Sequence, residues 1–310
     1  MGRQMRERVR VSVPATTANL GPGFDCLGMA LELFNEVAVE AGRGLEFSLE
    51  GYGAESLPQD RRNLVYRGLA AVFERAGVVV PGLRIFARNR VPPGRGLGSS
   101  AAAIVGGMVA GNLLLGEPLS REELLAQGAG MEGHPDNVAP ALFGGCQAVA
   151  RDGDEFIRAP LPLPTALLAV LFIPEFQMPT RKARVLLPPQ VSREDAVFNL
   201  ARVAFLVRAL ATGELEYLRP GTQDRLHQPA RQALFPAMGR LFDAALQAGA
   251  RGVFLSGAGS SILAFTDGEE RAPEIARALE KAAAGAGVTG RSLITRPSLR
   301  GAEERPWKEE

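Results

Sequence analysis

Three glycines at alternate positions, Gly94, Gly96 and Gly98, constrain the fold of this chain more than any other feature of its sequence. Glycine adopts left-handed backbone conformations and lets the backbone approach a ligand closely. Two serines follow the glycines, and the apolar run 101–115 is long enough for a buried helix. A glycine loop that opens a helix presents free N–H groups at the positive end of the helix dipole, which suits a phosphate. The sequence therefore predicts a phosphate loop leading into a central helix.

A glycine pattern of this kind also fits a tight strand-to-helix turn without a ligand. A Walker loop would place a lysine after its last glycine, but Ser99 stands there, and the only lysines are Lys182, Lys281 and Lys308. Phosphate charge must then be met by backbone N–H groups, a metal ion and arginines. We expect a methyl group at Gly98 to crowd the phosphates and to leave the stability of the free protein ordinary.

The size and charge of the chain exclude several classes of protein. With 310 residues it is long enough for two domains, and a net charge of +1 gives no reason to expect nucleic acid or an acidic membrane surface as partner. Two cysteines form no disulfide framework and fit a reducing compartment. The charged N-terminus resembles no signal peptide, and the longest apolar runs are too short to span a bilayer. The predicted location is the cytoplasm.

The first half of the chain predicts strands and helices in alternation. Residues 8–13 alternate as a half-buried strand, 31–40 and 45–50 resemble a hairpin, Asn63 caps a helix over 64–76, and 83–90 is a strand leading to the phosphate loop. Ser120 and Glu123 form a capping box.

The proline-rich segment 159–164 cannot continue a central strand and is the predicted domain boundary. Beyond it, a strand over 166–173, a helix capped by Ser192, a helix over 236–248, two strands, a helix over 269–284 and a last strand predict a ferredoxin-like domain. The core positions expected in the helix after Ser192 are Val197, Leu200, Val203, Val207 and Leu210. We therefore predict an α+β protein with domains at 1–160 and 161–300 and a disordered tail at 301–310.

Four segments in order resemble the GHMP kinase superfamily, in the form found in homoserine kinases. They are the loop 14–25 (PATTANLGPGFD), the glycine loop 92–102 (PPGRGLGSSAA), the segment 132–140 (EGHPDNVAP) with Gly144-Gly145 after it, and the loop 256–259 (SGAG). The resemblance covers roughly residues 9–300 and implies a two-layer fold with the nucleotide held by the N-terminal domain and the substrate at the domain junction. It also implies ATP- and Mg²⁺-dependent phosphorylation of the side-chain hydroxyl of L-homoserine, in threonine biosynthesis.

The resemblance assigns roles to individual residues. Substrate contacts are implied for Asn19, Asp25, His134, Asn137, Thr180, Arg184, Arg231, Gly257 and Gly259. Nucleotide contacts are implied for Asn63, Pro92, Pro93, Gly94, Arg95, Gly96, Leu97, Gly98, Ser99, Ser100, Ala101 and Ala102. Catalytic roles are implied for Asp136, Asn137 and Arg184, and magnesium binding for Ser100 and Glu132.

Chemistry supports some of these roles and leaves alternatives to others. Asp25 beside Phe24 needs a cationic partner, which an α-ammonium group supplies, and two arginines suit a carboxylate. Mg²⁺ prefers a few hard oxygen ligands and bridges nucleotide phosphates. Asn19 also fits simple turn chemistry, Asn63 an N-cap alone and Ser100 a helix cap.

Several questions stay open from the sequence. Glu122 or Glu123 could hold the metal in place of Glu132. Asp136 could act as general base, or the transfer could proceed without one. Ser260 stands where the family usually has proline, so the third loop could close less rigidly. The rival functions are a mevalonate-type or sugar kinase and a catalytically silent nucleotide sensor; a homodimer is an open alternative.

Overall fold

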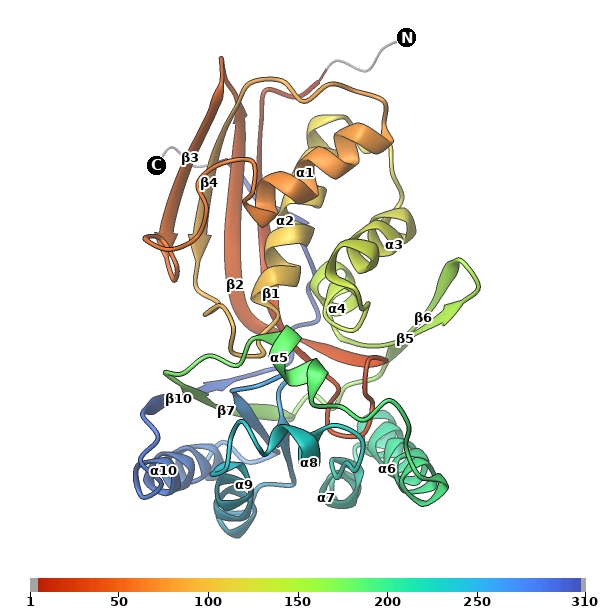
Figure 1. The fold of residues 1–310 in the computed structure, drawn as a ribbon, viewed down its shortest axis with the longest axis vertical. Coiled ribbons are helices and arrows are strands. Elements are labelled where there is room, and N and C mark those ends of the chain that lie inside the picture. Colours follow the sequence, from red (N-terminus) through yellow and green to blue (C-terminus); the bar gives the residue numbers. More distant parts are fainter. Residues whose placement is uncertain (1–4, 308–310) are drawn as a thin grey trace.

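The first layer of the protein is a sheet built on buried valines. The computed structural model describes residues 5–307. Val9, Val11 and Val13 are buried in β1 (Arg8–Ala18), as their alternation predicts. The expectation of a half-buried strand is wrong, because Arg10 and Ser12 between them are buried as well. The sheet has the order β11-β1-β2-β4-β3, and the hairpin of β5 and β6 joins it at β2 (Figure 1). Its other strands are β2 (Leu27–Ala41), β3 (Leu45–Gly51), β4 (Leu83–Asn89), β5 (Cys146–Asp152), β6 (Glu155–Leu161) and β11 (Glu303–Glu304).

Four helices cover one face of this sheet, with α2 at their centre (Figure 1). They are α1 (Leu64–Arg75), α2 (Ser99–Leu114), α3 (Arg121–Glu132) and α4 (Val138–Phe143). α2 is apolar on all sides, and a Cβ at Gly107 would lie 1.9 Å from the carbonyl oxygen of Val65 in α1. The predicted central helix is confirmed. Its glycines let α1 pack directly against its backbone.

The second layer is a four-stranded antiparallel sheet of order β10-β7-β9-β8. Numbered within this half, the strand order is 4-1-3-2, the arrangement of a ferredoxin-like sheet. Its strands are β7 (Leu168–Pro174), β8 (Gly252–Leu255), β9 (Ile262–Thr266) and β10 (Gly290–Thr295). The helices of this half are α5 (Thr180–Val185), α6 (Arg193–Thr212), the 3₁₀ turn η1 (Leu215–Tyr217), α7 (Leu218–Gly221), α8 (Gln228–Arg231), α9 (Met238–Gln247) and α10 (Arg271–Ala284). The α+β class and the ferredoxin-like domain are confirmed.

Two further expectations about elements are wrong. β2 and β3 form no hairpin, because β4 lies between them and β3 pairs with β4 in parallel. The crossover through α1 explains this order, since a parallel pair needs a helix-sized connection. In α6, the expected core position Leu210 is buried, but Val197 and Leu200 are 58% and 70% exposed, so the first turns of the helix leave these two apolar side chains at the surface.

The expectation of a disordered tail is also wrong for residues 301–307. Ala302 is fully buried and its N–H donates to the carbonyl of Ala141 at 2.7 Å. β11 pairs with β1 through Val11 and Ser12. Backbone pairing with an open sheet edge orders a segment whose side chains are mostly charged. Residues 308–310 of the expected tail lie outside the described residues.

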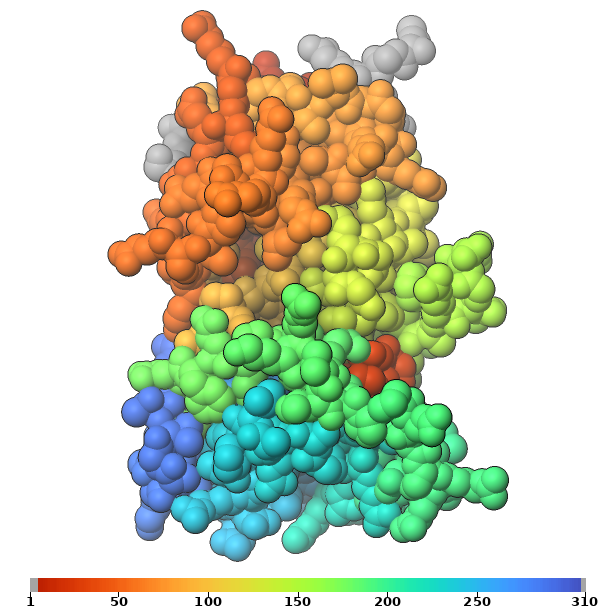
Figure 2. Space-filling model, viewed as in Figure 1, coloured from red at the N-terminus to blue at the C-terminus, as the bar shows by residue number. Residues whose placement is uncertain are grey.

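The two halves share one of their hydrophobic cores. Leu20, Leu27 and Leu97 from the first half pack in the same cluster as Leu171 and Phe254 from the second. The segment that carries α5, green in Figure 2, lies across the junction of the two halves. The division into 1–160 and 161–300 stays a prediction.

Candidate active site

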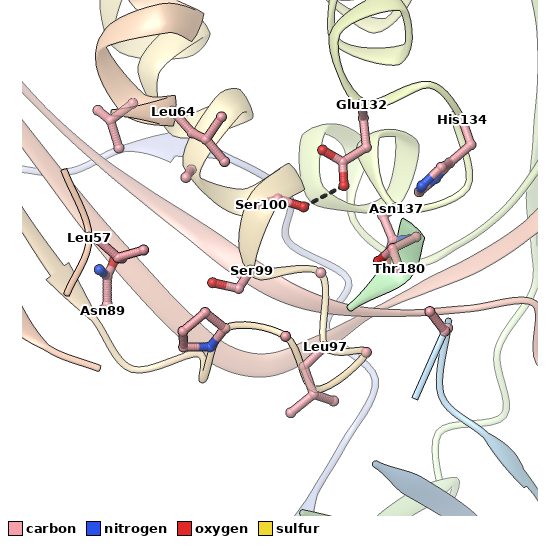
Figure 3. A pocket seen from close by; sticks show the side chains of 18 of the residues that line it. Leu57, Leu64, Asn89, Leu97, Ser99, Ser100, Glu132, His134, Asn137 and Thr180 are labelled. Carbon is pink, nitrogen blue, oxygen red and sulfur yellow. Dashed lines mark hydrogen bonds between the residues drawn. The ribbon is translucent and has the colours of Figure 1, made fainter. Parts of the chain in front are cut away.

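A cavity of about 270 Å³ lies where the two halves meet. One end is largely apolar and is lined by residues of β3, β4, α1 and the loop before α1. The other end is polar, and the glycine loop lies between them (Figure 3). The apolar end is lined by Leu49, Leu57, Pro58, Arg62, Asn63, Leu64, Val65, Ala87, Asn89 and Pro93, and the polar end by Asn19, Asp25, Glu132, His134, Asp136, Asn137, Thr180, Arg184, Arg231, Gly257 and Ala258.

The glycine loop presents backbone N–H groups to the cavity. Gly94, Gly96 and Gly98 have φ values of 69°, 72° and 65°, conformations that other residues rarely adopt. Gly98 is the N-cap of α2, and no side chain caps that helix end. Helix N-termini without a cap leave up to four N–H groups for an external acceptor. This geometry is the one that the predicted anion site requires, and the site itself stays a prediction.

The side chain of Arg95 is not where a nucleotide contact, as expected from the sequence, would place it. It does not line the cavity. Its guanidinium donates to the backbone carbonyls of Pro93, Pro174 and Glu175 at 2.9, 2.9 and 2.6 Å. The left-handed turns on either side of Arg95 direct its side chain toward the second half of the molecule. Pro92, Ala101, Ala102 and Gly259, which were also predicted as contacts, do not line the cavity either.

The third loop closes against the glycine loop. Ser256 Oγ donates to the Gly96 carbonyl at 2.6 Å, and the Ser261 N–H donates to the Arg95 carbonyl at 3.1 Å. Ser260, at the position where the family usually has proline, is fully buried and its Oγ donates to the Phe176 carbonyl at 2.7 Å. The serine thus adds a hydrogen bond that proline could not make.

Ser100 and Glu132 meet at the end of α2 that faces the polar half of the cavity. The Ser100 hydroxyl donates to the Glu132 carboxylate (Figure 3). Burial raises the pKa of Glu132, and the hydrogen bond from Ser100 only partly offsets this. Glu123, one alternative ligand, accepts from the Ser120 N–H at 2.8 Å within its capping box. Over residues 5–307 no group of three or more His, Cys, Asp or Glu residues could hold a metal by itself.

Asp136 is the centre of a buried hydrogen-bonded chain. His134 Nδ1 lies 2.6 Å from Asp136 Oδ1, and Asn137 Nδ2 donates to the same oxygen at 3.3 Å. Asn137 Oδ1 in turn accepts from the Thr16 hydroxyl at 2.7 Å. Burial by itself would lower the pKa of His134, but the hydrogen bond and charge of Asp136 outweigh it and the pKa is raised.

Asp25, in the loop after β1, and Arg184, in α5, come together from parts of the chain far apart in the sequence. Two guanidinium nitrogens of Arg184 donate to the two carboxylate oxygens of Asp25 at 2.8 and 2.6 Å, and each side chain is about one-third exposed. Asn19 holds the loop, since its Oδ1 accepts from the Asp25 N–H at 3.1 Å and its Nδ2 donates to the Gly257 carbonyl at 3.0 Å. Thr180, at the start of α5, also lines this end.

Arg231 lies behind this ion pair and is 1% exposed. Its Nη1 donates to the Gly257 carbonyl and to His227 Nδ1, each at 2.9 Å. Its Nε is buried and has no hydrogen-bond partner among the described residues. Burial, and then the charge of Arg184, lower the pKa of Arg231 to about 10, so it remains a cation at neutral pH.

At the apolar end Asn63 caps α1, and both ends of its amide are in use. Its Oδ1 accepts from the Val65 N–H at 2.9 Å and its Nδ2 donates to the Pro58 carbonyl at 2.7 Å. Sequence reasoning missed Leu49, Leu57 and Asn89 at this end, because single residues in strands and in the loop before α1 carry no motif. It also missed Asp224 and His227 beneath Arg231.

The sequence of the chain matches two family models and many known proteins. Residues 63–145 match the family model "GHMP kinases N terminal domain" and residues 206–285 match "GHMP kinases C terminal". The chain is 48% identical over 278 residues to a homoserine kinase of Moorella thermoacetica, covering 90% of this chain and 93% of that protein. It is 49% identical over 275 residues to a homoserine kinase of a Synechococcus species, covering 88% and 90%.

The fold of the chain is also similar to that of a homoserine kinase whose structure has been solved. The crystal structure of homoserine kinase from Cytophaga hutchinsonii superimposes with a TM-score of 0.88 at 32% sequence identity, covering 98% of this chain and 99% of that one. Separately, none of the helices formed within residues 5–307 has the length and apolar character needed to cross a membrane.

Proposed function

The chain belongs to the homoserine kinases, a family of the GHMP kinases, and from this premise we propose how its cavity transfers the γ-phosphoryl group of ATP to the side-chain hydroxyl of L-homoserine. The observation that carries the proposal is that one cavity joins the uncapped N-terminus of α2 to the Asp25–Arg184 ion pair. The first feature suits phosphate, and the second suits a zwitterionic amino acid.

In this proposal ATP lies along the cavity from its apolar to its polar end. The base packs among Leu49, Leu57 and Leu64, and Asn63 holds the neighbouring loop in place. The phosphates accept hydrogen bonds from N–H groups of the loop and of the first turn of α2, over residues 94–100. Arg95 acts on the nucleotide only through the shape of this loop.

Homoserine binds at the polar end by exchange of ion pairs. Its ammonium group takes the place of Arg184 on Asp25, and its carboxylate binds Arg184 and the unpartnered Nε of Arg231. The substrate's own opposite charges thereby replace each partner of the pair, so no charge is left uncompensated. The proposed further contacts are Asn19, His134, Asn137, Thr180 and Gly257, all of which line the cavity.

The hydroxyl of homoserine then faces Asp136 and Asn137, while Arg184 acts through the carboxylate that it holds. Phosphoryl transfer depends mainly on positioning and on stabilisation of charge. The Asp136 carboxylate, whose direction is fixed by His134 and Asn137, accepts the hydroxyl hydrogen bond. Asp136 has this role whether the proton moves to it before or after the phosphoryl group is transferred.

The residues present fit a magnesium ion, the cofactor that this proposal includes. Ser100 and Glu132 offer two hard oxygens beside the phosphate loop, and the buried Glu132 carboxylate lacks a cationic partner within hydrogen-bond distance among the described residues. When bound, the ion neutralises charge on the phosphate oxygens. The unpaired cysteines Cys26 and Cys146 suit the cytoplasm, which is the proposed location.

A panel of substrates tests the proposed reaction. ADP release is followed with homoserine, mevalonate and galactose, at saturating ATP and Mg²⁺. Turnover with homoserine alone supports the proposal. Faster turnover with mevalonate or galactose contradicts it, and ATP binding without turnover on any of the three would favour a nucleotide sensor.

The carboxylate site is tested with 3-aminopropanol, which lacks only that group. Removal of one partner of a buried charge pair costs roughly 2–5 kcal/mol, so the wild type should prefer homoserine by about 30-fold or more in kcat/KM. Arg184→Ala should lose most of this preference, while activity on 3-aminopropanol falls far less. An equal loss on both substrates would mean that Arg184 acts on the phosphate or on the fold.

A further inference from the structure

Arg231, which lines the cavity, forms a hydrogen bond with His227, which lies outside it. His227 is fully buried in the turn before α8 and does not line the cavity. Its Nε2 lies 2.7 Å from the Gly21 carbonyl oxygen, and its Nδ1 lies 2.9 Å from Arg231 Nη1. A carbonyl only accepts and a guanidinium only donates, so this network assigns the proton to Nε2 and the lone pair to Nδ1.

The surroundings keep this tautomer neutral and fixed. Burial lowers the pKa of His227 to about 4, although the nearby Asp224 carboxylate opposes that shift. Asp224 accepts from the N–H groups of Leu226, His227 and Gln228 at 3.0, 2.9 and 2.7 Å, which anchors the turn. The Phe24 ring stacks on the imidazole with centroids 5.3 Å apart.

The Phe24 ring also lies close to the two arginines of the site. The guanidinium carbons of Arg184 and Arg231 each lie 5.5 Å from the Phe24 centroid, within the range of cation–π attraction. Phe24 therefore lies within cation–π range of both guanidinium groups and also contacts the His227 ring. His227 is the side chain that makes a directional bond to Arg231, alongside the Gly257 carbonyl.

We infer that His227 is a positioning residue, whose Nδ1 lone pair orients the Arg231 guanidinium so that its unpartnered Nε faces the substrate carboxylate. The inference rests on the proposed function, in which Arg231 binds that carboxylate. Its consequence is selectivity: His227 favours substrates that carry a carboxylate and does not affect transfer to the hydroxyl itself.

Two variants separate the bonds that His227 makes. In His227→Asn the side-chain oxygen can take the place of Nδ1 and still accept from Arg231, while the donor to Gly21 is lost. In His227→Gln the amide nitrogen can take the place of Nε2 and still donate to Gly21, while the acceptor for Arg231 is lost. Both variants are expected to be somewhat less stable than the wild type.

The readout is the ratio of kcat/KM for homoserine to that for 3-aminopropanol. His227→Gln should lose about tenfold or more of the ratio, as expected for a hydrogen bond to a charged group, mainly through a higher KM for homoserine. His227→Asn should keep the ratio within about threefold of wild type. A purely structural role would lower turnover of both substrates alike and leave the ratio unchanged in both variants, which would overturn the inference.

Arg231→Gln distinguishes failure of the inference from failure of the proposed function. If Arg231→Gln loses the preference for homoserine and His227→Gln keeps it, the carboxylate site stands and the role of His227 is wrong. If Arg231→Gln also keeps the preference, Arg231 does not bind the carboxylate and both assignments fail.

Discussion

Among single residues, Glu132 has the environment that most favours a bound cation. Its carboxylate is buried beside the phosphate loop and its partner is a neutral hydroxyl. Glu132→Gln preserves the shape and the hydrogen bond from Ser100 but removes the charge. We expect the Mg²⁺ concentration for half-maximal rate to rise about tenfold or more, with an unchanged melting temperature.

Glu122→Gln on the exposed first turn of α3 is the matched control. It should titrate with Mg²⁺ like the wild type. A shift in Glu122→Gln and none in Glu132→Gln would move the metal site to the other end of the helix.

Asp25 can be tested with 4-hydroxybutanoate, which lacks only the ammonium group of homoserine. Asp25→Asn removes the proposed partner of that group and also releases Arg184 from its ion pair. Because both side chains are about one-third exposed, we expect a loss of about tenfold in kcat/KM for homoserine rather than more. Activity on 4-hydroxybutanoate should stay level or rise. A parallel fall on both substrates would show that Asp25 does not contact the ammonium group.

At this scale the sequence predicts which residue types gather but not where they point. Asp136 and His134 are neighbours in one motif and do share a hydrogen bond. Arg95 also belongs to a motif, yet it binds carbonyls of the second half, because backbone turns set its direction. Asp224 suits a turn by residue type, since it accepts from three successive N–H groups, but only the fold places that turn next to Arg231.

Among the elements, the glycine loop is more tightly packed than its sequence indicates. A Cβ at Gly98 would lie 1.8 Å from Thr16 Oγ1, whose hydroxyl donates to Asn137. The expectation of ordinary stability for Gly98→Ala therefore has to be revised. We predict a loss of about 2 kcal/mol or more in the free energy of unfolding, together with weaker ATP binding by calorimetry.

Gly77→Ala provides the control for backbone strain alone. Gly77 has a similar φ of 68°, but no atom lies within 4 Å of its added Cβ. It should lose only about 1 kcal/mol and bind ATP normally. Equal stability losses in the two variants would mean that the contact with Thr16 costs nothing.

Element types were predictable where local signals are strong, and their pairing was less so. Asn63 and the capping box at Ser120 mark helix starts as the structure has them. The exposed face of α6 and the insertion of β4 between β2 and β3 depend on contacts made after the chain folds back. Periodicity indicates that a helix has an apolar side but not which neighbours will cover it.

For the whole molecule, the decisive feature is the return of the chain to its first sheet. After the second half is complete, residues 301–305 run along β1 and α4. The Ala302 N–H donates to Ala141 at 2.7 Å, the Arg305 N–H donates to Arg10 at 2.8 Å, and Arg121 binds the Ala302 carbonyl at 3.0 Å. The C-terminal segment thus contributes to the layer that carries the phosphate loop.

Deletion of residues 301–310 tests this contribution. It removes β11, uncovers the edge of β1 and leaves buried backbone groups near Ala141 unpaired. With net values near 1 kcal/mol per hydrogen bond, we expect a loss of about 2–4 kcal/mol and a fall in melting temperature of about 4 °C or more. Glu304→Gln keeps the backbone and weakens only an exposed ion pair with Arg6, so its melting temperature should change by less than about 1 °C. If the deletion variant has the melting temperature of the wild type, residues 301–310 do not contribute to stability. A loss confined to the deletion would show that backbone pairing, and not charge, joins the end of the chain to its beginning.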